Sequence, residues 1–147
     1  MNPAGRKEAG VTSATTSATE AVHQAIPLAK TLGIVVVSDR AEEVRCRLEW
    51  SDALSGAGVG LHGGAIMALA DITGGICAFL NLPEGAAGTT TIESKTNFLR
   101  AVRSGHVEAV SRPLHTGRSV VVVETDVIDA EGGPAARVIQ SQIVLRS

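Results

Sequence analysis

Alternating apolar and polar residues mark a strand in the first third of the chain. Val44, Cys46, Leu48 and Trp50 alternate there with Glu43, Arg45, Arg47 and Glu49. A period of two is typical of an antiparallel strand with one buried face. Residues 33–39, GIVVVSD, are rich in β-branched side chains and favour another strand just before it. The pattern therefore predicts two adjacent strands.

A helical period precedes these strands. The apolar residues that share it are Val22, Ile26, Ala29 and Leu32. Pro27 is expected to divide the segment into two short helices, and Gly33 to end the second. Residues 1–19 are small and polar without any period, and we interpret them as a disordered tail. Residues 20–147 are then expected to form a single domain.

The most apolar stretch predicts one long helix, from His62 or Gly63 to about Leu80, after a glycine-rich loop. At 100° per residue, the larger side chains gather on a face expected to pack on a sheet: Ile66, Leu69, Ile76, Cys77 and Leu80. The opposite face carries Asp71 among mostly small residues: Gly64, Met67, Ala68, Gly74, Gly75 and Ala78.

The second half of the chain has a strand pattern. Residues 88–100, 105–115, 118–129 and 135–146 are rich in Val, Ile and Thr. The sequences RSG, HTG and AEGGP between them have turn composition. One long helix combined with antiparallel strands predicts a two-layer α+β fold.

Asp71 is the one charged residue in the predicted long helix. It could be a surface charge, but an exposed helix usually carries Lys, Glu or Arg as well. It could be a satisfied polar residue at a helix–helix contact, which small residues permit. We favour a functional carboxylate in a cleft, since a partly buried carboxylate is costly unless it is paired or used.

Two glycines at the helix start suggest a second part of a site. The free N–H groups and the helix dipole at Gly63 and Gly64 favour an oxyanion or another anion. Gly63 and Asp71 lie about 12 Å apart along one helix, too far to meet at one carbonyl group. Two antiparallel helices related by a two-fold axis could bring them together, which predicts a homodimer with two shared sites.

Composition excludes several other classes of protein. A net charge of -2 gives no basic excess for nucleic acid or an anionic membrane, and only Trp50, Phe79 and Phe98 are aromatic. We expect no membrane span, because Gly, Thr and Asp71 interrupt the apolar helix, and no secretion signal. Cys46 and Cys77 read as reduced thiols of a cytoplasmic protein. The sequence has no clustered His/Cys pattern of the kind that binds zinc.

The motif HGGAIMALAD, followed by TTTIESKTNFLRAVRSGHVEAVSRPLHTGRSVVVVETDV, resembles the hotdog-fold acyl-CoA thioesterases of the PaaI type. These include the phenylacetate-pathway and Arthrobacter-type 4-hydroxybenzoyl-CoA enzymes, and the resemblance covers roughly residues 25–146. It implies a long helix wrapped by a curved antiparallel sheet of five to six strands, in dimers that usually form tetramers. It also implies hydrolysis of an acyl-CoA thioester without a metal or an organic cofactor.

The same resemblance implies roles for individual residues. Asp71 matches the acid that acts as general base or nucleophile, and the Gly63 amide of the partner subunit matches the oxyanion donor. His62 matches a histidine with a positional role. Thr89 is the best match to a hydroxyl residue beside the acid, with residues 90–91 close by.

The chain departs from the family pattern at Gly56, where an Asn or Gln often stands six residues before the histidine; Ser55 is adjacent. Arg100, Arg103 and Arg118 are candidates to bind the CoA phosphates. The remaining candidate substrate-binding residues are Gly64, Gly75, Asn97 and Gly117.

Two alternatives stay open. Gly56 leaves room for a module that binds acyl-CoA with little or no hydrolysis. A hotdog hydratase would usually pair a histidine with the acid on the active helix, and none stands near Asp71 on this helix. Met67 and Phe79 suggest an apolar pocket, which does not identify the acyl group.

Overall fold

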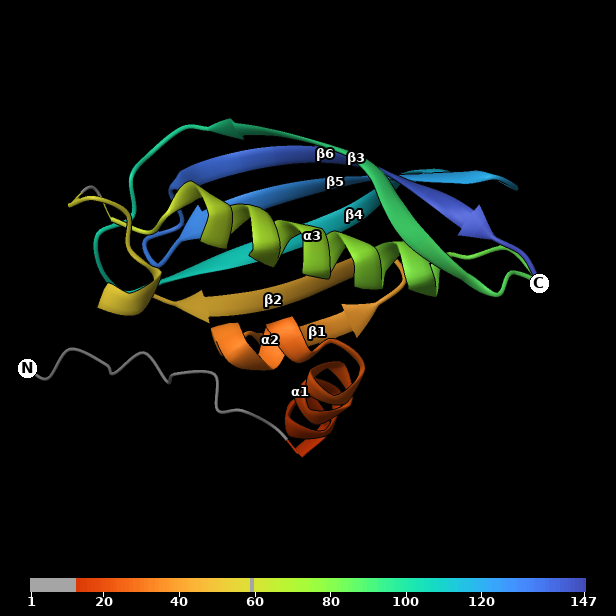
Figure 1. Ribbon diagram of the computed structural model, residues 1–147, viewed down its shortest axis with the longest axis horizontal. Helices are drawn as coiled ribbons and strands as arrows, with labels where there is room; N and C mark the ends of the chain where they lie inside the picture. Colours follow the sequence, from red (N-terminus) through yellow and green to blue (C-terminus); the bar gives the residue numbers. More distant parts are fainter. Residues whose placement is uncertain (1–12, 59) are drawn as a thin grey trace, which may run out of the picture.

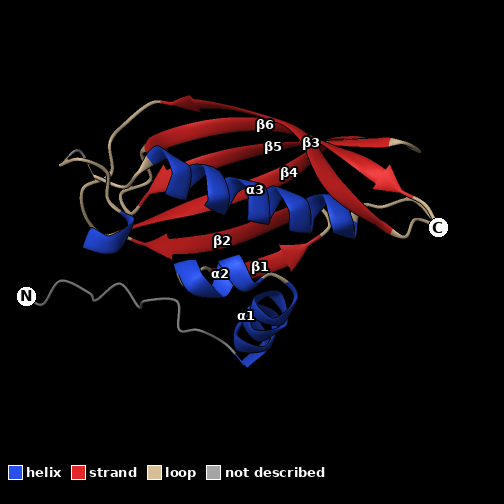
Figure 2. Ribbon diagram, viewed as in Figure 1, coloured by secondary structure: helices blue, strands red, loops and turns tan. Residues whose placement is uncertain are grey.

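The structure is a computed structural model that describes residues 13–58 and 60–147. Its elements are α1 (Ser13–Ala25), α2 (Pro27–Leu32), β1 (Val35–Arg40), β2 (Glu43–Glu49), a short 3-10 turn (Asp52–Leu54), α3 (Gly63–Leu80), β3 (Gly88–Phe98), β4 (His106–Thr116), β5 (Val120–Asp129) and β6 (Pro134–Leu145). The strands form one antiparallel sheet in the order β1-β2-β4-β5-β6-β3. Helix α3 lies along one face of it, and α1 and α2 lie beside β1 (Figures 1 and 2). The predicted α+β hotdog fold is confirmed, with six strands.

The N-terminal helix is longer than expected. Residues 13–19, assigned to a disordered tail from the sequence, form the first half of α1, so that expectation is wrong for them. Residues 1–12 lie outside the described part of the chain. The Thr19 hydroxyl accepts a hydrogen bond from the Val36 N–H at 3.0 Å, which ties α1 to β1. This long-range bond leaves no periodic signal in the sequence.

The predicted break between the two short helices is confirmed. Pro27 opens α2, where its missing N–H is no loss. Gly33 closes α2 with φ 74°, a left-handed conformation that glycine adopts without strain. The chain then enters β1 at once.

The core lies between α3 and the inner face of the sheet. Along β5, alternate residues from Val121 to Val127 are buried, and β2 shows the same alternation. The buried residues of α3 are Ile66, Leu69, Ala70, Ile72, Thr73, Gly74, Cys77 and Ala78. The expected helix face was therefore partly wrong: Leu80 is exposed, whereas Gly74 and Ala78 are buried. The buried face turns toward Gly74 because a side chain of β6 packs against it.

Gly, Thr and Asp71 do not interrupt the apolar stretch of α3 enough to exclude a membrane span by composition, contrary to the expected reason. Its 18 residues are long and apolar enough to cross a membrane by length and composition alone. In the fold it contacts all six strands of the sheet, so its apolar face is that of a core helix.

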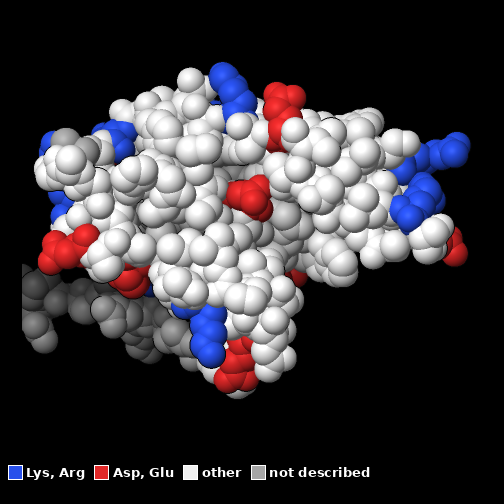
Figure 3. Space-filling model, viewed as in Figure 1, with Lys and Arg blue, Asp and Glu red and all other residues white. Residues whose placement is uncertain are grey.

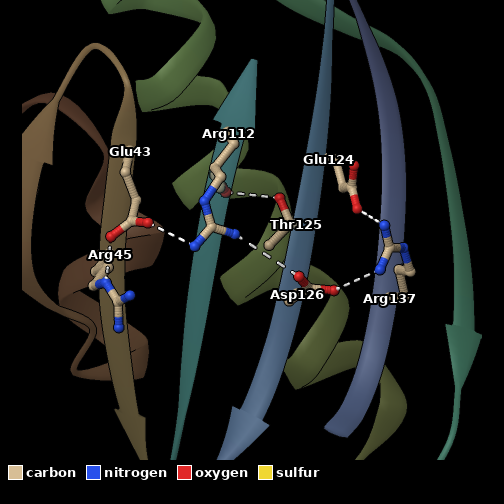
Figure 4. A network of polar contacts seen from close by, with 8 residues as sticks. Glu43, Arg45, Arg112, Glu124, Thr125, Asp126 and Arg137 are labelled. Carbon is tan, nitrogen blue, oxygen red and sulfur yellow. Dashed lines mark hydrogen bonds and ion pairs between the residues drawn. The ribbon is translucent and has the colours of Figure 1, made fainter. Parts of the chain in front are cut away.

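The outer face of the sheet carries a ladder of ion pairs (Figure 4). We call this set the outer ladder: Glu43, Arg45, Arg47, Glu108, Arg112, Glu124, Asp126 and Arg137. Arg112 joins Glu43 of β2 at 2.6 Å to Asp126 of β5 at 3.9 Å. Arg45 and Arg112 together hold the pKa of Glu43 below its ordinary value.

Candidate active site

Asp71 lies half-buried in the middle of α3, and two neutral groups donate to it. The Thr91 hydroxyl of β3 donates to Asp71 Oδ1 at 2.7 Å. The Gln140 side-chain amide of β6 donates to the same oxygen at 3.2 Å. In the described part of the chain, no group donates to Oδ2 and no cation pairs with Asp71. One carboxylate oxygen is thus anchored and the other is free.

A second glutamine orients the threonine. Gln142 Nε2 donates to the Thr91 oxygen at 2.6 Å, so the single hydroxyl hydrogen of Thr91 is left for Asp71. Gln142 Oε1 in turn accepts from the Thr89 hydroxyl at 3.3 Å. Gln140 and Gln142 are 0% and 1% exposed, so this network is shielded from water on the side of the sheet.

Thr91 supplies the hydroxyl beside Asp71. The family resemblance had favoured Thr89, and that prediction is wrong. The single hydroxyl hydrogen of Thr89 is shared between the Ile143 backbone carbonyl at 2.9 Å and Gln142 Oε1 at 3.3 Å, so Thr89 reaches the carboxylate only through Gln142. The two threonines share one face of β3 but lie two residues, about 6.5 Å, apart along the strand. That distance decides which one contacts Asp71.

Sequence reasoning missed Gln140 and Gln142. A signal for them does exist: β6 alternates buried and exposed residues, and two amides occupy consecutive inward positions between Val138 and Val144. Buried amides on an otherwise apolar strand face need hydrogen-bond partners inside the core. Asp71 on the facing helix is that partner.

An apolar cavity of about 530 Å³ opens beside the carboxylate. Its lining comes from α1, α3, β3 and β6: Ala21, Val22, Ala25, Ile26, Asp71, Ile72, Gly75, Ile76, Phe79, Thr89, Thr90, Thr91 and Gln142. Asp71 is the only ionisable residue among them. The predicted substrate-binding residue Gly75 is part of this wall, and a side chain there would point into open space.

The start of α3 has one free backbone donor. His62 is the N-cap, and its Nδ1 accepts from the Gly64 N–H at 2.8 Å. The Gly63 N–H bonds with no acceptor among residues 13–58 and 60–147. The Phe98 ring packs over Gly63, 3.0 Å from where a Cβ would stand. The predicted anion-binding group at this helix end is therefore Gly63, while the Gly64 N–H is used by His62.

Among the described residues of the loop before α3, no side-chain donor is aimed at the site. Gly56 N–H bonds to the Gly60 carbonyl at 2.8 Å, which closes the loop on itself. The Ser55 hydroxyl donates to the Asp52 carbonyl at 2.7 Å, so it does not replace the side-chain amide that position 56 lacks.

Arg100 and Arg103 lie at the same end of the molecule as the start of α3. The Leu61 N–H bonds to the Val102 carbonyl at 2.8 Å, which joins the segment carrying both arginines to the loop entering α3. Both arginines line a second hollow of about 240 Å³. Arg100 also pairs with Asp129 at 3.2 Å. Backbone N–H groups of the β5–β6 turn, and then Arg100, lower the pKa of Asp129.

The other predicted binding residues are not brought to Asp71. Gly117 and Arg118 form the β4–β5 turn, where the Arg118 carbonyl accepts from Arg146 at 2.9 Å. Asn97 is exposed on β3 and accepts from Lys95 at 2.7 Å. Within a single subunit, Gly117, Arg118 and Asn97 therefore stand apart from the cavity.

The cysteines are free thiols in buried positions. Burial raises the pKa of Cys46 to about 11 and that of Cys77 to about 11. A thiol with so high a pKa is a poor nucleophile near neutral pH. Among the described residues, no three His, Cys, Asp or Glu side chains gather as a metal site would require.

Comparisons with known proteins place this fold in a known family. A model of the thioesterase superfamily matches residues 60–136, from the loop before α3 to the first residues of β6. A Saccharolobus solfataricus protein described only provisionally as an esterase is 32% identical over 118 residues, 80% of this chain and 83% of that protein.

Two further similar proteins carry names that state a reaction. The 1,4-dihydroxy-2-naphthoyl-CoA hydrolase of Escherichia coli K12 is 35% identical over 72 residues, 49% of this chain and 52% of that enzyme. The match thus spans about half the length of that enzyme. The crystal structure of thioesterase HI1161 from Haemophilus influenzae has a TM-score of 0.80 at 25% identity, and covers 87% of this chain and 90% of that one.

Proposed function

Because the chain belongs to the thioesterase superfamily, whose members hydrolyse thioesters, we propose that its substrate is an acyl-CoA and that Asp71 drives the hydrolysis. The observation that carries this proposal is the carboxylate itself. Asp71 has one oxygen anchored by Thr91 and Gln140 and the other free, at the edge of an apolar cavity. The coenzyme A ester follows the name of the Escherichia coli relative.

The free oxygen of Asp71 takes a proton from water as the water oxygen attacks the thioester carbonyl carbon. The carbonyl oxygen becomes an oxyanion that accepts from a backbone N–H. When the C–S bond breaks, the thiolate of CoA leaves and is protonated, and the free acid remains. Asp71 could instead attack the carbon directly, and water would then cleave the resulting anhydride. Both routes consume one water and release one thiol.

The oxyanion donor comes from a second copy of the chain in this proposal. Gly63 and Asp71 lie about 12 Å apart on α3, so one subunit cannot direct both at one carbonyl group. Strand β3 is an edge strand with exposed Ile92 and Phe98, and Met67 of α3 is also exposed. Figure 3 shows this face largely uncharged, with an acidic group near its middle. An uncharged face of this kind suits a two-fold contact, and the resulting dimer would pair Asp71 with Gly63 of the partner subunit.

The cavity indicates an apolar acyl group. A volume of about 530 Å³ lies within the usual range of small-molecule pockets. Ala21 and Ala25 of α1 and Gly75 of α3 leave the space open, and Phe79 adds an aromatic wall. Ala25→Phe is expected to narrow the cavity and to shift preference toward shorter acyl groups.

Release of free thiol from a panel of acyl-CoA esters tests the proposal, with wild type beside Asp71→Asn. The panel holds phenylacetyl, hydroxybenzoyl and saturated acyl groups of increasing length. We expect release by wild type and its loss in the variant, with the dimer intact by light scattering. If wild type binds the esters but releases no thiol, the chain is instead an acyl-CoA-binding module. Gly56, in place of an amide donor, is the feature that favours that second function.

A further inference from the structure

Gln140 makes a contact with α3 that the proposed function does not account for. Its side chain is 0% exposed, and its amide nitrogen donates to Asp71 Oδ1. Its amide oxygen is buried and has no hydrogen-bond partner among the described residues. A buried amide oxygen without a partner is unfavourable by about 1–3 kcal/mol. The position therefore requires a reason other than stability.

The reason lies in Gly74, one helical turn after Asp71. A Cβ built on Gly74 would stand 2.3 Å from Gln140 Oε1 and 2.6 Å from its Cδ. The amide thus packs flat against the helix backbone, and only glycine at position 74 leaves room for it. The Cα–H groups of Gly74 offer Oε1 a weak contact in place of a full hydrogen bond.

Resting on the proposed function, we propose that Gln140 and Gly74 form a lock that positions Asp71 for catalysis. Gly74 fixes where the Gln140 amide lies, and the amide fixes Oδ1 from the sheet side, while Thr91 holds the same oxygen from β3. With Oδ1 held by two donors, Oδ2 is the oxygen directed to water or to the thioester. Gln140 is a positioning residue, since it acts through Asp71.

The amide orientation agrees with this role. An amide oxygen turned toward an ionised carboxylate would repel it, whereas the amide nitrogen stabilises the ionised form. Other ionisable groups on the surrounding elements do not pair with Asp71: Glu20 and His23 on α1, Glu93 and Lys95 on β3, and Arg137 on β6. His23 bonds to the Ile34 carbonyl at 2.7 Å instead. The two neutral donors are therefore what holds this carboxylate.

The test is a double-mutant cycle of Gln140→Ala and Gly74→Ala, with Gln140→Met as a variant of nearly conserved volume that lacks the donor. We expect each single change to lower kcat about 10- to 100-fold with KM within threefold, because a small displacement of a catalytic group has an effect of that size. Gly74→Ala should have almost no further effect in the Gln140→Ala background, since the clash is then gone. Additive losses would overturn the lock.

A matched control and a direct readout separate positioning from folding. Thr125→Val removes a buried inward polar group of β5 that bonds to Ser111 at 2.7 Å and does not touch Asp71. It should leave kcat within twofold even if the protein becomes less stable.

Carbon-13 NMR of the Asp71 carboxyl group tests the lock without any substrate. Its carbon-13 chemical shift at neutral pH should change in Gln140→Met, which lacks the donor to Oδ1, and stay unchanged in Thr125→Val. A chemical shift and a kcat both equal to wild type in Gln140→Met would refute the inference. If wild type hydrolyses no ester but the chemical shift still changes, the proposed function fails and the lock on Asp71 stands.

Discussion

The two faces of the sheet hold their carboxylates in opposite ways. On the outer face, both oxygens of Glu43 are occupied, one by Arg45 and the other by Arg112, each at 2.6 Å. On the inner face, Asp71 receives a hydroxyl and an amide on one oxygen and leaves the other free. The first arrangement stabilises the charge but leaves neither oxygen available to a substrate. The second holds the carboxylate in place and leaves one oxygen available for chemistry.

The comparison also shows what burial adds. The outer ladder is partly exposed, so water and salt screen it. The amides of Gln140 and Gln142 are buried, where each hydrogen bond is stronger and a missing partner is more harmful. Removing one donor on the inner face should therefore change the position of Asp71. Removing one group of the outer ladder should have a small effect, because its neighbours still pair with one another.

Replacing one carboxylate on each face should give the largest difference in kcat between the two faces. Asp71→Asn should lower kcat for thioester hydrolysis by about 10²- to 10⁴-fold, the range for loss of a general base. Glu43→Gln should keep kcat within about twofold, because Glu43 lies on the far side of the sheet. Steady-state thiol release measures both. Comparable losses in the two variants would contradict the division between the faces.

The buried thiols report how well the inner side excludes solvent. With a pKa of about 11, Cys46 has roughly 0.1% thiolate at pH 8. We expect native protein to react with a thiol-specific disulfide reagent at least about 100-fold more slowly than a free thiol. Both cysteines should react when the chain is unfolded in urea. Fast reaction in the native state would show that the core opens.

The two threonines of β3 sharpen the description of the inner face. Thr91→Val removes a donor to Asp71 and leaves Gln142 without its acceptor, so kcat should fall about 10-fold. Thr89→Val should have a smaller effect, about threefold or less, because Thr89 contacts the network only through Gln142. The ratio of the two kcat values is the measurement. A larger loss for Thr89→Val would assign the hydroxyl beside the acid to Thr89 after all.

Breaking the outer ladder should have the smallest effect. Arg112→Ala is expected to lower the free energy of unfolding by less than about 1 kcal/mol at pH 7, since exposed pairs contribute little. The lowered pKa of Glu43 means that its contribution is present above its ordinary value of 4.5 and is lost as pH falls through the lower folded value. Urea unfolding at pH 7 and pH 3 should therefore show a smaller difference in the free energy of unfolding between variant and wild type at pH 3. A larger difference at pH 3 would contradict a stabilising pair between Arg112 and ionised Glu43.

Much of the fold was predictable because it rests on local patterns. The alternation in β2, the turn compositions between the later strands and the break at Pro27 each follow from neighbouring residues. Asp71 was also predictable, since it is the single charge in an apolar helix. The start of α1 was not: it is tied down by Thr19 bonding to a strand seventeen residues later.

The functional site also combines features set by neighbouring residues with features set by long-range contacts. The chain alone determined that a carboxylate, a glycine-rich helix start and an apolar helix belong to one α+β unit, because these are properties of consecutive residues. Only the tertiary structure decided that Thr91 is the hydroxyl beside Asp71, that Gln140 donates to it from β6, and that Gly74 makes room for that amide. Such contacts join residues up to 69 positions apart. Strand register and helix rotation set them, and both depend on how the whole core packs.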